Sequence, residues 1–341
     1  MTAVSPGRRV PHLVCPAGNL PSLRAAVDAG ADAVYLGLRD NTNARAFGGL
    51  NFDVPTAREG VAYAHARGAQ VLLVINTYPQ PGTWTRWTAA IDTAATLGVD
   101  AVIVADAGLM RYARDRHPAL RLHLSVQGSA TNHEAINFYH EHFGVRRAVL
   151  PRVLSIEQVE QVMRHTPVEI EVFGFGSLCV MVEGRCALSS YVTGEAPNLA
   201  GVCSPARAVR WEPRRDGLEA RLGDLLIDKY RAGEHAGYPT VCKGRFVADD
   251  EDPYYAIEEP TSLNALALLP RLADMRIAAI KIEGRQRSPA YVQAVTTAWR
   301  TALDQYARDG HHAPAPAVAA ALNRVAEGRM ETLGAYHRPW K

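Results

Sequence analysis

The strongest constraint on the fold is a unit of one helix and one short apolar strand that recurs along most of the chain. The segments AGADAVYLG, RGAQVLLVIN and LGVDAVIVAD each place a glycine just before an apolar strand. Such a glycine ends the preceding helix, and strands without polar alternation are typical of a parallel sheet that is buried on both faces. We therefore expect an α/β fold built on a parallel sheet.

Eight such strands are expected. They cover residues 12–17, 33–38, 71–76, 101–106, 122–127, 147–151, 169–174 and 277–284. Eight repeats of the unit predict a (β/α)8 TIM-like barrel. An open doubly wound sheet is the alternative, but no G-x-G-x-x-G sequence follows the first strand to support it.

The length of the chain predicts an insertion in this barrel. A plain barrel takes about 250 residues, whereas the chain has 341. We place the barrel at residues 11–308, with an insertion at residues 177–252 after the seventh strand and a helix at Leu263–Met275 before the last strand. Residues 309–341 are Pro/Ala-rich at their start, and we expect a linker and a peripheral C-terminal helix there.

Composition narrows the class of protein. The 37 basic and 35 acidic residues nearly cancel, and no basic tract suggests a nucleic-acid-binding tail. No apolar run approaches the length of a membrane span, and the first ten residues do not resemble a secretory signal. We expect a cytoplasmic protein, in which thiols stay reduced and clustered cysteines more often bind metal than form disulfides.

Four of the five cysteines gather in the expected insertion: Cys179, Cys186, Cys203 and Cys242, separated by six, sixteen and thirty-eight residues. Four thiolates suit either tetrahedral zinc or an iron–sulfur cluster. Structural zinc sites usually contain tight C-x2-4-C pairs, and none occurs here, so the spacing favours a [4Fe–4S] cluster. Zinc and four unligated thiols remain the alternatives. The basic residues expected to offset the thiolate charge are Arg185, Arg207, Lys243 and Arg245.

Polar residues and glycines follow the ends of the predicted strands, where barrels of this type carry their active sites. They are Cys15, Gly37, Asn43, Arg45, Asn76, Asp106, Gln127, Arg152, Gly176, Glu283, Gly284 and Arg285. They line a pocket or, on the simpler interpretation, cap helices and bind loop backbone. Arg45, Arg152 and Arg285 would suit a substrate with carboxylates. Cys15 is expected to be a buried small apolar residue, and no hydrolase or P-loop motif identifies a catalytic residue.

The cysteine segment resembles the signature of a known family. Glu171-x-Phe173-x-x-Gly176-Ser177-Leu178-Cys179, followed by Gly184-x-Cys186-x-Leu188-Ser189, is similar to the signature of the collagenase-like peptidases, the unclassified peptidase family thirty-two. The segments CPAGNLPSL, DNTNAR, SVQGSATN, CALSSYVTGEAPN, YPTVCKGR and KIEGRQRSPAYV resemble one branch of it, which acts in oxygen-independent ubiquinone biosynthesis. The resemblance covers residues 11–306.

The resemblance implies a function. It implies a [4Fe–4S] cluster on the four cysteines, a paralogous partner subunit, UbiV, in a heterodimer, and hydroxylation of a ubiquinone precursor ring without dioxygen. It also implies prephenate as the oxygen donor, with Arg45, Arg152 and Arg285 as candidate ligands of its carboxylates. Other members hydroxylate bases of RNA, which is the alternative, although the near-zero net charge opposes it. Phe175 stands where many members carry histidine, which weakens an RNA-modifying or peptidase role.

Two further expectations concern the insertion. Its apolar residues Val180, Met181, Val182 and Tyr191 are candidates for the partner interface. Burial against the barrel is the simpler explanation for all four.

Overall fold

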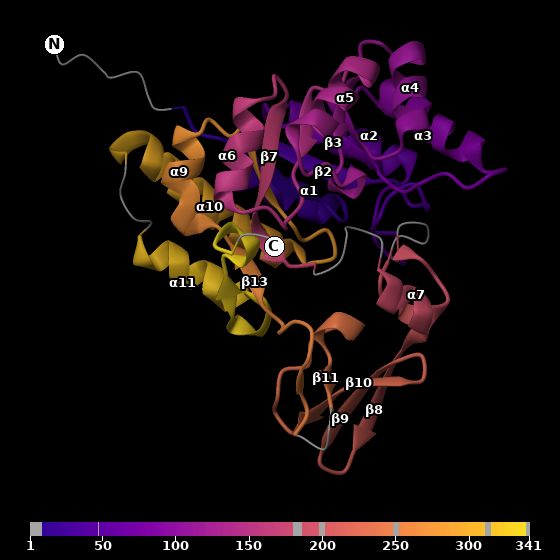
Figure 1. Cartoon of the computed structure of the whole chain (residues 1–341), viewed down its shortest axis with the longest axis vertical. Coiled ribbons are helices and arrows are strands. Elements are labelled where there is room, and N and C mark those ends of the chain that lie inside the picture. Colours follow the sequence, from indigo (N-terminus) through magenta and orange to yellow (C-terminus); the bar gives the residue numbers. More distant parts are fainter. Residues whose placement is uncertain are drawn as a thin grey trace.

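The computed structural model describes residues 9–46, 48–179, 186–197, 202–247, 252–310 and 315–338. Eight parallel strands form its centre (Figure 1). They are β1 (His12–Pro16), β2 (Ala33–Gly37), β3 (Gln70–Ile75), β4 (Ala101–Val104), β5 (Arg121–Leu124), β6 (Arg147–Val149), β7 (Glu169–Ser177) and β14 (Ala279–Ile282). Neighbours in this order pair, and β14 pairs with both β1 and β7, so the sheet closes. The predicted (β/α)8 barrel is confirmed, and the open sheet is excluded.

The helices that follow the strands cover the outside of the barrel. They are α1 (Leu20–Asp28), α2 (Val54–His65), α3 (Trp84–Leu97), α4 (Ala107–Arg116), α5 (His133–Phe143), α6 (Ile156–Arg164), α9 (Leu269–Asp274) and α10 (Pro289–Asp309). Most begin at a short polar residue whose side chain accepts the backbone N–H three positions later, as Asn19 does for α1 and Asn132 for α5. Gly98 and Gly144 end α3 and α5 in the left-handed conformation. These local signals explain why the helices were predictable.

The inside of the barrel is divided into an apolar and a charged half. The apolar half comes mainly from β1 to β4 and comprises Val14, Ala33, Tyr35, Leu72, Val74, Ala101, Ile103 and Ala279. On the strands β5, β6, β7 and β14, His123, Arg147, Glu171 and Lys281 are also buried. Because buried charges are unfavourable without partners, this half must be paired internally.

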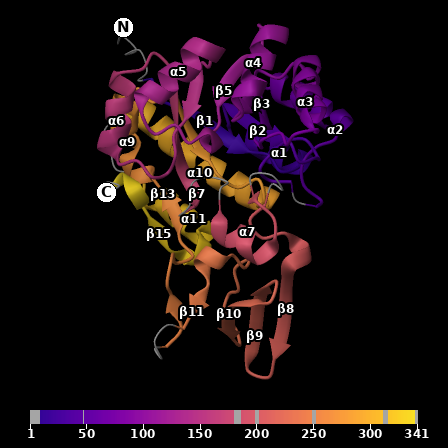
Figure 2. The ribbon, with the colours of Figure 1, turned by 45° about the vertical axis from the view of Figure 1, so that its right-hand side comes forward.

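Between β7 and β14 the chain builds a separate lobe, which Figures 1 and 2 show projecting from the barrel. Its main part is an antiparallel sheet of β8 (Val209–Arg214), β9 (Gly217–Leu222) and β10 (Leu225–Arg231). A hairpin of β11 (Arg245–Phe246) and β12 (Tyr254–Tyr255) and the short helix α7 (Ala187–Thr193) complete it. Its small core of Leu222, Ile227 and Val241 packs against α7 through Leu188 and Val192. The lobe lies where the insertion was expected, and the domain boundaries given above remain a prediction.

The helix expected at Leu263–Met275 is wrong in its first part. Residues Ser262–Asn264 form strand β13, which pairs antiparallel with the end of β7, and α9 begins only at Leu269. β7 continues beyond the other barrel strands, and its extra backbone groups need hydrogen-bond partners. β13 supplies them, so tertiary pairing overrides the local helical pattern.

The C-terminal segment does more than was expected. The predicted peripheral helix exists as α11 (Pro316–Val325), which packs on α10. Beyond it, β15 (Glu331–Thr332) pairs with β13, and the hydroxyl of Tyr336 donates to the carbonyl of Phe173 on β7 at 2.8 Å. The end of the chain therefore supports the strand from which the lobe departs.

The apolar residues singled out in the insertion can be checked in part. Tyr191 is 93% exposed, so the interpretation that it is buried against the barrel is wrong. Val180, Met181 and Val182 lie outside the described residues. Among the described residues, no helix combines the length and apolar character needed to cross a bilayer.

Candidate functional site

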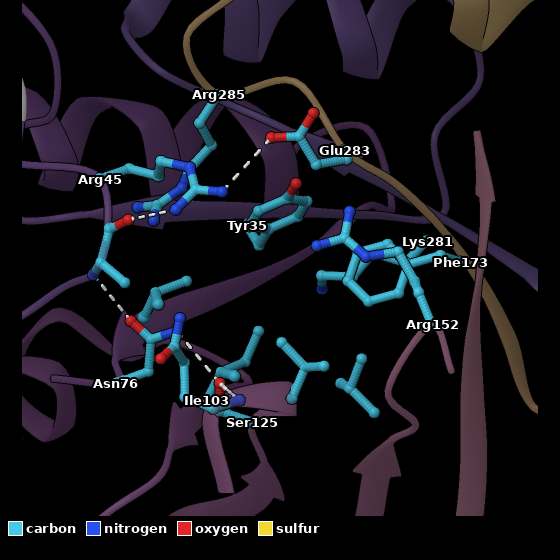
Figure 3. A pocket seen from close by; sticks show the side chains of 15 residues that line it. Tyr35, Arg45, Asn76, Ile103, Ser125, Arg152, Phe173, Lys281, Glu283 and Arg285 are labelled. Atoms are coloured by element: carbon cyan, nitrogen blue, oxygen red, sulfur yellow. Dashed lines mark hydrogen bonds and ion pairs between the residues drawn. The ribbon is translucent and has the colours of Figure 1, made fainter. Parts of the chain in front are cut away.

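A pocket opens at the carboxyl ends of the barrel strands, with a cavity volume of about 70 Å³. It is lined by Tyr35, Ala44, Arg45, Val74, Asn76, Ile103, Ser125, Val126, Gln127, Val149, Arg152, Phe173, Lys281, Glu283 and Arg285. Figure 3 shows Arg45 and Arg285 on one side and Arg152 and Lys281 on the other, with Tyr35 between them. Four cations and one carboxylate thus surround one small space, which favours an anionic ligand.

The three arginines predicted from strand ends all line this pocket. Arg285 is 4% exposed, and its Nη1 donates to Asn43 Oδ1 at 2.9 Å. Burial lowers the pKa of Arg285 to about 10, and the charge of Arg45 adds to the lowering, yet the guanidinium stays cationic at neutral pH. The guanidinium of Arg152 lies 4.4 Å from the Phe173 ring centroid and donates to the carbonyl of Ser177. Asn43 therefore positions Arg285, and β7 positions Arg152.

Glu283 is the acidic residue of the pocket. Burial would raise its pKa, but the positive charges of Arg45, Arg152 and Arg287 outweigh burial and lower it. Its Oε1 lies 3.8 Å from Arg45 Nη2, and its Oε2 accepts the N–H of Ser177 at 3.4 Å. Glu283 is thus an ionised group that holds Arg45 toward the pocket.

Neutral polar groups form another part of the lining. Asn76 Oδ1 accepts the N–H of Ala44 at 2.9 Å, and Asn76 Nδ2 donates to Ser125 Oγ at 3.0 Å. Gln127 is 4% exposed, and its buried Oε1 accepts no hydrogen bond from the described residues. Since buried acceptors normally have partners, this oxygen suits a hydroxyl donor on a ligand or a water molecule.

A row of alternating charges runs from the pocket through the charged half of the barrel. Lys281 Nζ lies 2.7 Å from Glu171 Oε1, and Glu171 Oε2 lies 3.4 Å from Arg147 Nη1. Arg147 Nη2 then lies 2.8 Å from Glu169 Oε2, and Arg121 Nη2 lies 2.7 Å from Glu169 Oε1. The strand-end reasoning missed this row, although charged residues inside otherwise apolar barrel strands were the available signal.

The other predicted strand-end residues are structural. Cys15 is fully buried, accepts the Thr296 hydroxyl at 3.2 Å and, because of burial, has its pKa raised to about 12, as expected of a small buried residue. Asp106 caps α4 through the N–H of Leu109. Gly176 has φ 130°, and a Cβ there would lie 2.5 Å from Glu283 Cβ. Glycine at this position therefore allows Glu283 to lie against β7.

Gly37 and Gly284 also allow close packing at the barrel mouth. An added Cβ would lie 2.6 Å from Arg285 Nη1 at Gly37 and 2.8 Å from Tyr291 at Gly284. Neither glycine brings a functional side chain to the pocket.

The four cysteines come from different segments, some of which lie close to one another. Cys179 follows the end of β7, and Cys186 is the N-cap of α7, where its Sγ accepts the Ser189 N–H at 3.3 Å. The Ser189 hydroxyl donates to the carbonyl of Cys203. Burial raises the pKa of Cys242 to about 11, with further raising contributions from the charges of Cys203 and Cys179. Cys242 therefore lies within electrostatic range of both.

The thiols provide the right donors for a cluster, but not a finished coordination site. Three of them are coupled electrostatically and the fourth through Ser189, so the donor chemistry fits an iron–sulfur group. Within the described ranges, however, no three His, Cys, Asp or Glu side chains are grouped closely enough to hold a metal ion. The cluster therefore stays a prediction.

The basic residues near the cysteines have carboxylate partners. Arg207 pairs with Glu195, Lys243 with Glu327, and Arg245 with Asp228, each at 2.6 Å. Of these, Lys243 also lowers the pKa of the neighbouring Cys242 thiol by its charge, against the net rise. Arg185 lies outside the described residues. Among the described basic residues, charge compensation of the thiols thus falls mainly on Lys243.

Comparison with known proteins gives consistent matches. The sequence profile described as Peptidase family U32 matches residues 18–339. The tRNA hydroxylation protein P of Escherichia coli K12 is 32% identical over 325 residues, which cover 87% of this chain and 68% of that protein. The tRNA hydroxylation protein P1 of Bacillus subtilis 168 is 30% identical over 312 residues, covering 89% and 66%. The 23S rRNA 5-hydroxycytidine C2501 synthase of E. coli is 28% identical over 293 residues, covering 86% and 39%. The chain spans about two thirds of the length of the first two and less of the third.

Proposed function

The chain belongs to peptidase family U32, and on that premise we propose that it is a subunit of a dioxygen-independent hydroxylase. Relatives named for hydroxylation of tRNA and rRNA support the reaction class. The finer proposal is a UbiU-type protein, which hydroxylates the ring of a ubiquinone precursor together with its paralogue UbiV. The quoted segments of the ubiquinone branch and Phe175, which is fully buried in place of the histidine of many members, support this choice.

One observation carries the proposal: the cysteine segment begins at the rim of the pocket. Ser177 donates its N–H to Glu283, and its carbonyl accepts from Arg152. Cys179 is two residues further along the same strand exit. A cofactor on the cysteines and a ligand in the cationic pocket would therefore share one stretch of backbone.

We propose that Cys179, Cys186, Cys203 and Cys242 hold a [4Fe–4S] cluster. When bound, such a cluster supplies electron transfer or activates an oxygen donor. Lys243, held at 2.6 Å by Glu327, keeps one positive charge beside the Cys242 ligand. Ser189 ties the segments of Cys186 and Cys203 together.

On the substrate side, we propose that the pocket binds the organic oxygen donor. Prephenate, the donor implied by the resemblance, carries two carboxylates, a ring hydroxyl and a ketone. Arg45, Arg152 and Arg285 would bind the carboxylates, because guanidinium groups form paired hydrogen bonds with them. The buried Gln127 Oε1 would accept from the hydroxyl. These residues would orient the donor and limit access of water to it.

An RNA-base hydroxylase is the second candidate, favoured by the 32% identity to a tRNA hydroxylation protein. A peptidase has less support. Ser125, the serine of the pocket lining, accepts hydrogen bonds from Asn76 Nδ2 and the Gln127 N–H, and neither donor is a general base.

The cluster is tested by anaerobic purification of the chain. We expect a brown protein with about four iron atoms per chain, as four cysteine ligands require. Cys203→Ala should lose the iron, whereas the matched control Cys15→Ala, which changes a cysteine inside the barrel, should keep it. One zinc per chain and no colour would refute the cluster.

The reaction is tested with the chain, UbiV, a demethylated ubiquinone precursor and isotope-labelled donors under anaerobic conditions. We expect the label of prephenate in the hydroxylated ring. Arg285→Gln should reduce turnover, and Arg271→Gln, which alters an exposed arginine paired with Glu157 on the outer helices, should not. Hydroxylation of tRNA but not of the quinone precursor would replace the proposal by the second candidate.

A further inference from the structure

Lysine is rare in this protein. Of 37 basic residues only Lys229, Lys243, Lys281 and Lys341 are lysines. Lys281 lies inside the barrel, where its side chain is 7% exposed. An arginine would supply a permanent charge and more hydrogen bonds, whereas lysine is the cation that loses its proton readily and forms covalent bonds to carbon. The position therefore points to amine chemistry.

The surroundings fix the amine at the pocket. On β14, Lys281 pairs with Val14 of β1 and Phe173 of β7. Its Nζ lies 2.7 Å from Glu171 Oε1 and 3.9 Å from the centroid of the Tyr35 ring. The Tyr35 hydroxyl donates to the carbonyl of Ile282 at 2.8 Å, which holds the ring in place. Lys281 nevertheless belongs to the pocket lining, beside Arg152 and Phe173 in Figure 3.

The surroundings of Lys281 favour its neutral amine form more strongly than water does for a free lysine. Burial lowers the pKa of Lys281, and the charges of Arg285 and Arg147 add to this lowering, while Glu171 opposes it. A lysine among cations in a desolvated site is a recurrent form of activated nucleophile.

We propose that Lys281 forms a Schiff base with the carbonyl carbon of a small oxo-carboxylate bound in the pocket. Arg285 or Arg152 would bind the carboxylate, and the carbonyl carbon would lie at Lys281 Nζ. The inference uses the pocket of the proposed function but neither its cluster nor its partner.

The step is balanced without an oxidant or reductant. The ammonium first loses a proton to water, and the amine lone pair attacks the carbonyl carbon, which forms the C–N bond. The carbonyl oxygen takes up two protons, one from the attacking nitrogen and the one first released to water, and leaves as water. The product is a protonated imine, so the nitrogen keeps its single positive charge. Glu171 therefore remains paired with a cation before and after the step, and no buried charge is left alone.

Reductive trapping tests the proposal. The full chain is incubated with pyruvate and sodium cyanoborohydride, which reduces an imine to a stable secondary amine, and labelled lysines are identified by peptide mass spectrometry. We expect the label on Lys281, with saturation as pyruvate increases. Lys229, which is 68% exposed, is the internal control and should label more slowly without saturation. Propionate, which has the carboxylate but no ketone, should leave no label.

Variants separate chemistry from charge. Lys281→Arg keeps the cation and should abolish the label at this position, while circular dichroism reports whether the fold is retained. Arg285→Gln should slow trapping at Lys281. If Lys281 of the unmodified chain stays unlabelled, or labels no faster than Lys229, the Schiff base is refuted. Cys203→Ala should still be trapped, so failure of the cluster proposal and failure of this one are distinguishable.

Discussion

Glu171 is the central carboxylate of the barrel interior, and its removal gives the sharpest test of the charge row. Glu171→Gln keeps the shape but leaves Lys281 without its partner at 2.7 Å, whereas Arg147 keeps Glu169 at 2.8 Å. At an effective dielectric constant of 20, two charges at that separation attract by roughly 6 kcal/mol. The loss of stability can be smaller than this, because Lys281 can release its proton and become neutral.

Proton release from Lys281 sets an upper limit on how much Glu171→Gln lowers the free energy of unfolding. Neutralising a lysine with a free-state pKa of about 10.4 costs roughly 5 kcal/mol at pH 7 and roughly 2 kcal/mol at pH 9. We therefore expect Glu171→Gln to lower the free energy of unfolding by about 3–5 kcal/mol at pH 7 and by about 2 kcal/mol at pH 9. The sign follows from linkage: the variant depresses the folded-state pKa of Lys281 further, so stability is lost as pH falls.

Urea denaturation followed by circular dichroism at both pH values measures this difference. The matched control is Glu169→Gln, which removes a carboxylate that is 42% exposed and should cost about 1 kcal/mol or less. The double variant Glu171→Gln/Lys281→Met should recover much of the loss, because the unpaired cation is gone. A Glu171→Gln variant as stable as the control, or equally destabilised at both pH values, would refute the reasoning.

Three further changes test the pocket. Glu283→Gln should destabilise the protein at neutral pH but not in acid. The lowered pKa of Glu283 contributes stability above its usual value of 4.5 that is lost as pH falls through the folded-state value, which acid-dependent urea midpoints would show. Gly176→Ala should cost about 2 kcal/mol or more, since its φ of 130° and the 2.5 Å approach to Glu283 exclude a Cβ; Gly68→Ala, with open space around it, should cost less in the same thermal melt. Arg285→Gln should weaken binding of a small dicarboxylate by roughly tenfold or more in calorimetry, whereas Arg271→Gln should leave it unchanged.

The barrel was predictable because its signals are local. Segments such as VLLVIN, followed by a polar cap and a helix, carry their own strand and helix boundaries. Strand β13 was not predictable, because Ser262–Asn264 becomes a strand only by pairing with the extended end of β7. The sheet β8–β10 of the lobe was also missed, since its strands mix charged and apolar residues and lack the continuous apolar runs of the barrel strands.

The pocket was predictable in part. Strand ends located Arg45, Arg152 and Arg285, because parallel strands bring their carboxyl ends to one rim. Lys281 and Glu171 were overlooked because they lie within strands, where the apolar neighbours dominated the interpretation. A lysine inside IAAIKIEG needs a buried partner, and that requirement alone could have identified it. Which carboxylate pairs with Lys281 depends on the register between the barrel strands, and the sequence alone does not specify that register.

The position of the lobe has a consequence for how freely this protein can diversify. The contact between Lys281 and Glu171 closes a loop of 110 residues, and loop closure of that length costs about 4 kcal/mol of chain entropy. Closing the shorter loop of an ordinary barrel repeat, roughly 30 residues, would cost about 3 kcal/mol of chain entropy. The whole lobe therefore adds only about 1 kcal/mol to barrel closure, because the entropy grows with the logarithm of loop length. Lineages could enlarge, shorten or replace the cysteine-bearing lobe while the barrel and its pocket kept their stability.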